Sequence, residues 1–160
     1  NKGVLKYSQK IVNYLKQEGK IVVVDPKKNL VNYEGADIVK LNESEYFKYC
    51  MIEGDFDEVR KFYKIGTLII TKGGEGAIIS NDDGLFEIPG VNIEVGDVTG
   101  AGDVFLASMV HYLAKGKGII DACAYANKLA AISVTKFGTY SVTEDDIRRS
   151  EEHTSELQSH

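Results

Sequence analysis

Residues 97–103 read Asp-Val-Thr-Gly-Ala-Gly-Asp, and residues 104–110 continue as the apolar run Val-Phe-Leu-Ala-Ser-Met-Val. The small residues at 100–102 stand where a helix is expected to begin, so their backbone N–H groups are uncovered and can bind an anion. Asp103 follows in the first turn, where the helix dipole favours its ionised form. The stretch therefore predicts a phosphate-binding turn with a base beside it. The alternative is a glycine-rich start of a buried helix, with Asp103 as a partner of the dipole.

The segments around this motif alternate between helical and strand patterns. Some carry apolar residues at helical spacing, and others are short apolar runs typical of strands buried on both faces of a sheet. Gly19 is expected to end the first helix, and residues 81–84 predict a tight turn between the last two strands. We expect helices at 4–18, 43–51, 55–64, 100–114 and 119–136, and strands at 21–25, 36–41, 67–71, 77–80 and 85–88. This order predicts an α/β fold with a doubly wound sheet and a late antiparallel edge.

The composition is that of one globular domain. The 160 residues are 43% hydrophobic and 27% charged, and the formal net charge is −5. This charge gives no electrostatic reason to expect nucleic acid or an anionic membrane as a partner. No apolar run approaches the roughly 18 residues of a membrane-spanning helix. The two cysteines, Cys50 and Cys123, are too few and too far apart for a disulfide framework or a zinc site, which favours a cytoplasmic protein.

Residues 149–160 break the pattern of the preceding chain. They read Arg-Ser-Glu-Glu-His-Thr-Ser-Glu-Leu-Gln-Ser-His and resemble the translation of a sequencing-library adapter. We therefore expect a native region at 1–148 and a non-native tail at 149–160. The alternative is an ordinary polar end of a C-terminal helix.

The motif at 97–103 resembles the signature of the PfkB/ribokinase family of carbohydrate kinases. The resemblance implies a ribokinase-like fold, of which this chain holds the C-terminal portion, and ATP-dependent phosphorylation of a sugar hydroxyl. By this resemblance, Gly100, Ala101 and Gly102 would form the anion hole for the phosphoryl group, and Asp103 would be the catalytic base. Phosphoryl transfer needs mainly positioning, charge stabilisation and such a base, which these residue types can supply.

Two further pairs of residues match metal positions of the family. Asn42 and Glu45, directly after an expected strand, match its N-x-x-E motif, whose oxygens hold Mg²⁺ through water. The same spacing is typical of a capping box at a helix start, and the two roles are compatible. Asp97 and Thr99 match positions that help hold a monovalent cation, although Asp97 could instead cap the turn.

Residues on three other segments match the nucleotide site of the family. Thr71, Gly73 and Gly76 belong to a glycine-rich turn after a buried strand, where the backbone would pass close to the ATP phosphates. Asn127 matches a helix position at the adenine pocket, and Gly138 lies in a downstream turn that would border the same pocket. For Asn127, an incidental place on an alanine-rich packing helix is the alternative.

Shorter matches resemble one branch of the family, the D-glycero-D-manno-heptose 7-phosphate kinase domain of ADP-heptose synthesis. They lie at 24–27, 33–37, 41–45 and 136–139. In the first of them, Lys27 next to Asp25 could meet a phosphate, unless Asp-Pro-Lys is only a polar turn. The predicted reaction is phosphorylation of heptose 7-phosphate at the anomeric position. The alternatives are another kinase of the family, such as a ribokinase or fructokinase, and a non-catalytic nucleotide-binding module.

The resemblance also sets expectations about partners. It implies ATP and Mg²⁺ as cofactors and a sugar or sugar phosphate as substrate. It leaves open a monovalent cation and a homodimer of the complete enzyme. Family members carry most sugar-binding residues upstream of the matched region, so we expect the 160-residue chain alone to be inactive.

Overall fold

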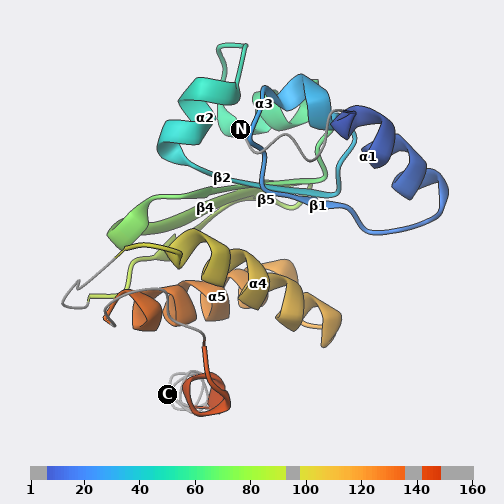
Figure 1. Ribbon diagram of the computed structural model, residues 1–160. Coiled ribbons are helices and arrows are strands. Elements are labelled where there is room, and N and C mark those ends of the chain that lie inside the picture. The colour runs from blue at the N-terminus through green and yellow to red at the C-terminus, as the bar shows by residue number, and fades with distance from the viewer. Residues whose placement is uncertain (1–6, 93–97, 136–141, 149–160) are drawn as a thin grey trace. The chain divides into compact units, whose positions relative to one another are not determined.

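The computed structural model describes residues 7–92, 98–135 and 142–148. Its helices and strands are labelled in Figure 1. The α-helices are α1 (Ser8–Gln17), α2 (Glu43–Tyr49), α3 (Phe56–Phe62), α4 (Ala101–Ala114) and α5 (Ile119–Val134). The strands are β1 (Val23–Val24), β2 (Ile38–Asn42), β3 (Thr67–Thr71), β4 (Gly76–Asn81) and β5 (Gly84–Pro89), and two 3₁₀ turns are η1 (Leu30–Tyr33) and η2 (Gly73–Glu75).

The described strands form one mixed sheet in the order β1-β2-β3-β4-β5. The β1–β2 and β2–β3 pairs are parallel, with Val39 opposite Leu68, and the β3–β4 pair is antiparallel, with Ile70 opposite Ile78. The turn between β4 and β5 is closed by the side chain of Asn81, which accepts a hydrogen bond from a backbone N–H two residues on, at 2.9 Å. The predicted α/β class and the late antiparallel strands are confirmed.

The described residues divide into two compact units. The first contains residues up to 72 together with 77–87, and the second contains 73–76 together with residues from 88 onward. In the first unit, α1, α2 and α3 cover one face of the sheet (Figure 1). Aliphatic side chains with no exposed surface fill the space between these layers, and burying each of them stabilises the fold by about 1.5 to 3 kcal/mol. They include Leu30, Val39, Leu41, Val59 and Leu68.

Left-handed residues end two helices of the first unit. Gly19 has φ +67°, and after it the N–H of Lys20 donates to the carbonyl oxygen of Leu15 at 2.9 Å, as in a Schellman motif. The predicted helix end at Gly19 is therefore confirmed. Lys64 takes the same position after α3 with φ +53°, so the helix expected at 55–64 ends two residues early.

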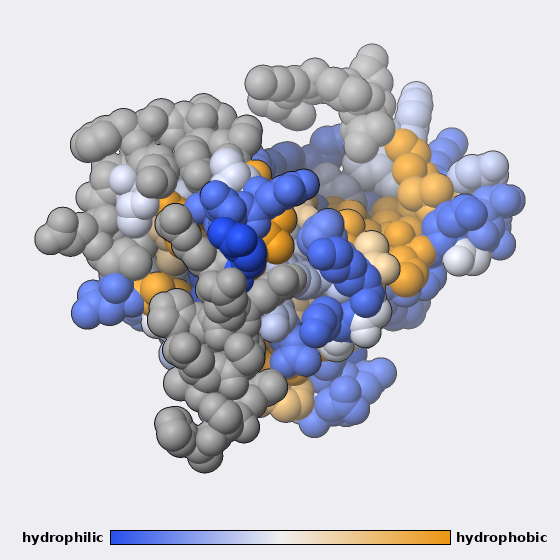
Figure 2. Space-filling view, turned by 90° about the horizontal axis from the view of Figure 1, so that it is seen from below, coloured by the Kyte–Doolittle hydropathy of each residue, from blue (hydrophilic) through white to orange (hydrophobic). Residues whose placement is uncertain are grey.

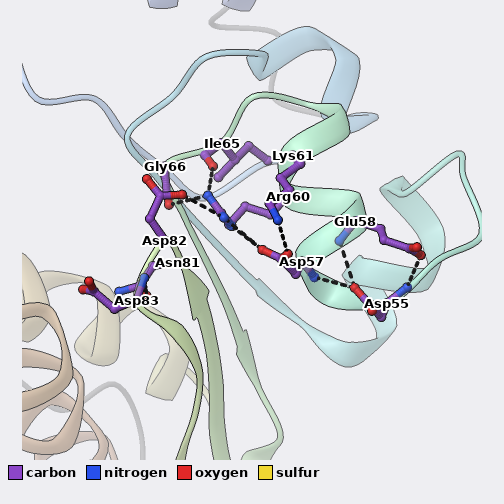
Figure 3. Close-up of polar contacts among 10 residues, drawn as sticks. All are labelled: Asp55, Asp57, Glu58, Arg60, Lys61, Ile65, Gly66, Asn81, Asp82 and Asp83. Atoms are coloured by element: carbon purple, nitrogen blue, oxygen red, sulfur yellow. Dashed lines mark hydrogen bonds and ion pairs between the residues drawn. The ribbon is translucent and has the colours of Figure 1, made fainter.

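Arg60 on α3 joins three segments of the first unit (Figure 3). It is only 4% exposed. Its guanidinium donates to the carbonyl oxygens of Ile65 and Gly66, both at 3.2 Å, and pairs with the carboxylates of Asp57 and Asp82, both at 2.9 Å. Asp82 lies in the β4–β5 turn, so this buried charge ties α3, the entry to β3 and that turn together.

The second unit is built around the helices α4 and α5. They run side by side in Figure 1 and are joined by residues 115–118. Tyr112 of α4 is fully buried and stacks on Tyr125 of α5, with ring centroids 4.5 Å apart and an angle of 18° between the rings. Burial also raises the pKa of the Cys123 thiol to about 12, so this side chain is a neutral part of the packing near pH 7.

Several element boundaries differ from the predicted ones. The strand expected at 21–25 is reduced to Val23–Val24, which pair with Ile38 and Val39, and the N–H of Val22 donates to the Asp37 carboxylate at 2.8 Å and not to a neighbouring strand. The helix expected at 119–136 ends at Val134. The turn η1 was not predicted from the sequence, since its four residues carry no periodic pattern.

The described surface is mixed in polarity. Figure 2 shows one face of the molecule, on which hydrophobic side chains lie in separate groups among hydrophilic ones. Tyr7 and Tyr14, on the outer side of α1, are the kind of large side chain that remains exposed, at 65% and 60%. Over the described ranges, no helix combines the length and the apolar character needed to cross a membrane.

Candidate active site

The start of α4 is formed by a glycine in the left-handed conformation. Gly100 has φ +84° and stands at the N-cap, where no side chain of the described residues caps the helix. The N–H of Ala101 donates to the carbonyl oxygen of Val98 at 3.3 Å. The N–H groups of Gly102 and Asp103 come next in the first turn, whose donors have no acceptor within the helix. The N–H groups of Gly102 and Asp103 are therefore the donors best placed for an anion. Gly102 belongs to the predicted anion hole at 100–102, and Asp103 directly follows it.

Asp103 presents its carboxylate at this same helix end. The residue is exposed, in the first turn of a 14-residue helix. The positive end of the helix dipole stabilises its negative charge, and exposure leaves the carboxylate open to a substrate hydroxyl. The described geometry thus puts N–H groups that have no acceptor within the helix, and a carboxylate, on one helix terminus. Thr99 is exposed just before it, whereas Asp97 lies outside the described residues.

Asn42 and Glu45 form a complete capping box where β2 passes into α2. The Asn42 Oδ1 atom accepts from the Glu45 N–H at 2.8 Å, and Glu45 Oε2 accepts from the Asn42 N–H at 3.0 Å. The capping alternative considered for these two residues is therefore present in the structure. It orients both side chains at the carboxyl end of β2, which is the end of parallel strands where ligands of α/β sheets bind.

Lys27 bridges this capping box to the end of β1. Its ammonium donates to Glu45 Oε1 at 2.9 Å and lies 3.1 Å from Asp25 Oδ2. Burial opposes both charges, but the hydrogen bonds and the charge pairing outweigh it, so the pKa of Glu45 is lowered and the pKa of Lys27 is raised above its usual range. The second oxygen of Asp25, Oδ1, is buried without a hydrogen-bond partner. The sequence placed Lys27 beside a strand end but did not indicate its contact with Glu45.

Thr71 lies beside this group at the carboxyl end of β3. It stands opposite Asn42 in the parallel β2–β3 register, and its hydroxyl donates to the carbonyl oxygen of Leu41 at 3.3 Å. The sheet thus brings together three predicted site residues, Asn42, Glu45 and Thr71, at one edge. No cluster of three or more His, Cys, Asp or Glu side chains suited to a metal ion occurs within the described parts of the chain.

The glycine-rich turn after β3 is held by backbone packing. Gly73 and Gly76 have φ +57° and +98°, values that favour glycine. A Cβ atom at Gly76 would lie 2.7 Å from the backbone nitrogen of Gly90, and a Cβ at Gly90 would overlap the carbonyl oxygen of Gly74. The turn and the chain after β5 therefore touch backbone to backbone. Gly90 was missed from the sequence, where only a Pro-Gly pair at the end of a strand marks it.

Asn127 of α5 belongs to the same neighbourhood. It is 9% exposed, and its amide nitrogen Nδ2 donates to the carbonyl oxygen of Pro89 at 2.9 Å. Within the second unit the structure thus brings Asn127 close to the chain that contacts the turn of Gly73 and Gly76. Gly138, the remaining predicted nucleotide residue, lies outside the described residues.

Comparison with known proteins identifies the family. Residues 5–146 match the pfkB family of carbohydrate kinases. The Bifunctional protein HldE of a Nitratiruptor species is 34% identical over an alignment that covers 94% of this chain and 34% of that protein. The protein of the same name from Vibrio cholerae serotype O1 is 33% identical over 89% of this chain and 32% of its own length. The chain therefore spans about a third of the length of these relatives.

Solved structures support the fold. Ribokinase from Thermotoga maritima superposes with a TM-score of 0.78 at 21% identity, over 91% of this chain and 54% of its own. Phosphofructokinase-2 from Escherichia coli gives a TM-score of 0.80 at 17% identity, over 94% and 53%. A nucleoside kinase of Burkholderia thailandensis, solved with inosine, gives 0.75 at 28% identity, over 90% and 52%. The predicted ribokinase-like fold is confirmed, and the chain belongs to the pfkB family of carbohydrate kinases.

Proposed function

We propose that this chain is the ATP-binding and base-carrying part of a kinase that phosphorylates a hydroxyl of a sugar or sugar phosphate. The observation that carries the proposal is the start of α4, where left-handed Gly100 precedes first-turn N–H groups without an acceptor in the helix and an exposed Asp103. The proposed substrate is heptose 7-phosphate, at its anomeric hydroxyl. Support for it comes from the short matches at 24–27 and 41–45 and from the similarity to the two relatives named above.

The proposed mechanism assigns one task to each part of this helix end. The acceptor oxygen attacks the γ-phosphorus of ATP, its proton passes to the Asp103 carboxylate, and the bond to the β-phosphate oxygen breaks to release ADP. The N–H groups of Gly102 and Asp103, in the turn that begins with Gly100 and Ala101, donate to the oxygens of the phosphoryl group in transfer, which stabilises their charge. A carboxylate takes the proton of an alcohol only as the new bond to phosphorus forms, which is the condition for general-base catalysis.

The proposed nucleotide site uses the turn after β3. Thr71, Gly73 and Gly76 would line the ATP phosphates, because glycine permits close approach of a ligand to the backbone. Gly138 is proposed to border the adenine. The reaction would take place in the cytoplasm, and the acceptor site would require residues outside the matched region, so we propose that the 160-residue chain alone is inactive.

Mg²⁺ fits the residues at the carboxyl ends of β2 and β3. Both oxygens of Glu45 already accept one hydrogen bond, yet each carboxylate oxygen can accept another, as can Asn42 Oδ1. These two side chains would therefore hold a hydrated Mg²⁺ through its waters. The ion, when bound, would neutralise phosphate charge. Asp97 and Thr99 are proposed to hold a monovalent cation near the start of α4.

The decisive experiment replaces the base in the complete gene product. We expect Asp103→Asn to lower kcat about 10²- to 10⁴-fold, because an amide cannot accept the hydroxyl proton, while ATP affinity measured by calorimetry stays within about twofold. Asp121→Asn is the matched control, since Asp121 occupies the first turn of the neighbouring helix α5 and is also exposed. Equal turnover in both variants would rule out the proposed base.

The acceptor is identified with a panel of substrates in the same protein. Heptose 7-phosphate should give the highest kcat/KM among heptose 7-phosphate, ribose and fructose. A preference for ribose or fructose would assign another kinase of the family. ATP binding with no transfer to any acceptor would favour the non-catalytic nucleotide-binding module.

A further inference from the structure

A buried amide on α5 holds the backbone at the end of β5. Asn127 is 9% exposed, and its Nδ2 atom donates to the carbonyl oxygen of Pro89 at 2.9 Å. A backbone carbonyl can only accept, so the nitrogen end of the amide is the end that faces Pro89. The two residues are 38 positions apart in the chain. This contact therefore fixes where the chain runs after it leaves the sheet.

The segment fixed in this way lies directly against the glycine-rich turn. A Cβ atom on Gly90 would overlap the carbonyl oxygen of Gly74 and would lie 3.0 Å from the carbonyl carbon of Glu75. A Cβ on Gly76 would come within 2.7 Å of the carbonyl carbon of Pro89. Contacts this close leave no room for a side chain at Gly76 or at Gly90. Any displacement of the Pro89–Gly90 backbone must therefore move the turn.

We propose that Asn127 is a positioning residue for the nucleotide-phosphate turn. It acts through the Pro89 carbonyl and the Gly90 backbone on residues 73–76, which belong to the same compact unit. The inference rests on the proposed function, in which that turn receives the phosphates of ATP. It changes the expected role of Asn127, because its effect falls on the polyphosphate chain and not on the adenine base. The same reasoning makes Gly90 a second positioning residue.

The first test measures the turn without any ligand. In the nucleotide-free 160-residue chain, Asn127→Leu keeps the number and branching of the side-chain heavy atoms but removes the donor, so amide hydrogen exchange of peptides covering residues 73–90 should become about tenfold faster. Asp121→Asn, on an exposed position of the same helix, should leave this exchange unchanged. Unchanged exchange in a folded Asn127→Leu variant would overturn the positioning role. Should circular dichroism show that this variant is unfolded, Asn127→Ser, a smaller change, is measured with the same expectation.

The second test separates the phosphates from the base. ATP and inorganic tripolyphosphate are titrated calorimetrically into the wild-type chain and the Asn127 variant, with Gly118→Ala as the control for Gly90→Ala because a Cβ there meets nothing within 4 Å. If Asn127 is a positioning residue, its replacement should weaken the binding of ATP and of tripolyphosphate by the same factor, about tenfold. Gly90→Ala should weaken the binding of both ligands by a similar factor. Weaker ATP binding with unchanged tripolyphosphate binding would place Asn127 at the base and overturn the inference. If the wild-type chain binds neither ligand, the proposed function fails, while the exchange experiment still decides whether Asn127 positions the turn.

Discussion

Gly100 is a single residue on which the start of α4 depends. Its φ of +84° lies in the left-handed region, although a Cβ there would meet no atom within 4 Å. Replacement by alanine is therefore strained by the backbone alone and not by crowding. The consequence is local, because the strain falls on the residue that sets the direction of the first-turn N–H groups.

The left-handed conformation of Gly100 can be tested by substitution, because a Cβ there would cause backbone strain without crowding. Gly100→Ala should lower the free energy of unfolding by about 1 to 2 kcal/mol, the cost of placing an L-residue in the left-handed region. Gly118→Ala should change it by less than about 0.5 kcal/mol, because Gly118 has φ −64° in equally open space. Urea denaturation of both variants measures the difference. Similar losses in both would mean that conformation is not what selects glycine at position 100.

The contacts of single side chains at the candidate site could be predicted only where both partners are close in the sequence. The Asn42–Glu45 spacing indicated a capping box, and the structure contains it, because both partners lie within one turn. The Lys27–Glu45 contact spans 18 positions and joins the chain after β1 to the first turn of α2. No local pattern encodes a contact of that kind, since it depends on the parallel order of β1 and β2.

At the scale of the element, α2 begins with an ion pair that depends on pH. Ionised Glu45 pairs with Lys27, which lowers its pKa below the ordinary value of 4.5. The stabilisation is therefore fully present above pH 4.5 and is lost as the pH falls through the lowered pKa. Glu45→Gln keeps a side chain that can cap the helix but removes the charge.

We expect Glu45→Gln to reduce the free energy of unfolding at pH 7 by a few tenths to about 1 kcal/mol, as for partly exposed ion pairs. The difference in the free energy of unfolding between this variant and the wild type should become smaller below pH 4.5. Glu43→Gln removes the same charge from the same turn, so the difference between the two variants reports the contact with Lys27. Denaturation curves at pH 7, 5 and 3 measure the free energy of unfolding of both variants and of the wild type. A difference between Glu45→Gln and the wild type that stays constant with pH would contradict the pairing of Glu45 with Lys27.

The boundaries of elements show what a periodic pattern can predict. The ends marked by glycine, such as Gly19, were predicted because glycine favours the left-handed conformation of a helix end. The end of α3 was not, because a lysine, which the sequence does not mark as a helix end, occupies that conformation at Lys64. β1 was predicted too long, since an apolar run shows burial but not which backbone N–H groups bond to another strand and which bond to a side chain, as Val22 does.

At the scale of the whole molecule, the first unit is tied together by one buried cation. Arg60 bonds two backbone carbonyls and two carboxylates from three different segments. Removing the guanidinium would leave the Ile65 and Gly66 carbonyl oxygens without this donor. Loss of a partner for a buried polar group costs about 1 to 3 kcal/mol.

Arg60→Met, which keeps an unbranched side chain, should therefore lower the free energy of unfolding by about 2 to 3 kcal/mol. Arg148→Met is the control, because the side chain of Arg148 is 69% exposed in its ion pair, and its loss should cost less than about 0.5 kcal/mol. Chemical denaturation followed by circular dichroism compares the two. A small effect at Arg60 would mean that water replaces the guanidinium at both carbonyls.

The two compact units also constrain how this chain can be made and exchanged. Residues 73–76 belong to the second unit, whose other residues begin at 88. Residues 77–87, which lie between these two parts in the sequence, belong to the first unit. No single cut in the gene separates the units, so one crossover cannot pass one unit to another protein and leave the other unit intact. During synthesis, the 73–76 turn leaves the ribosome before the helices that complete its unit, and it must wait for α5 before Asn127 can fix its surroundings.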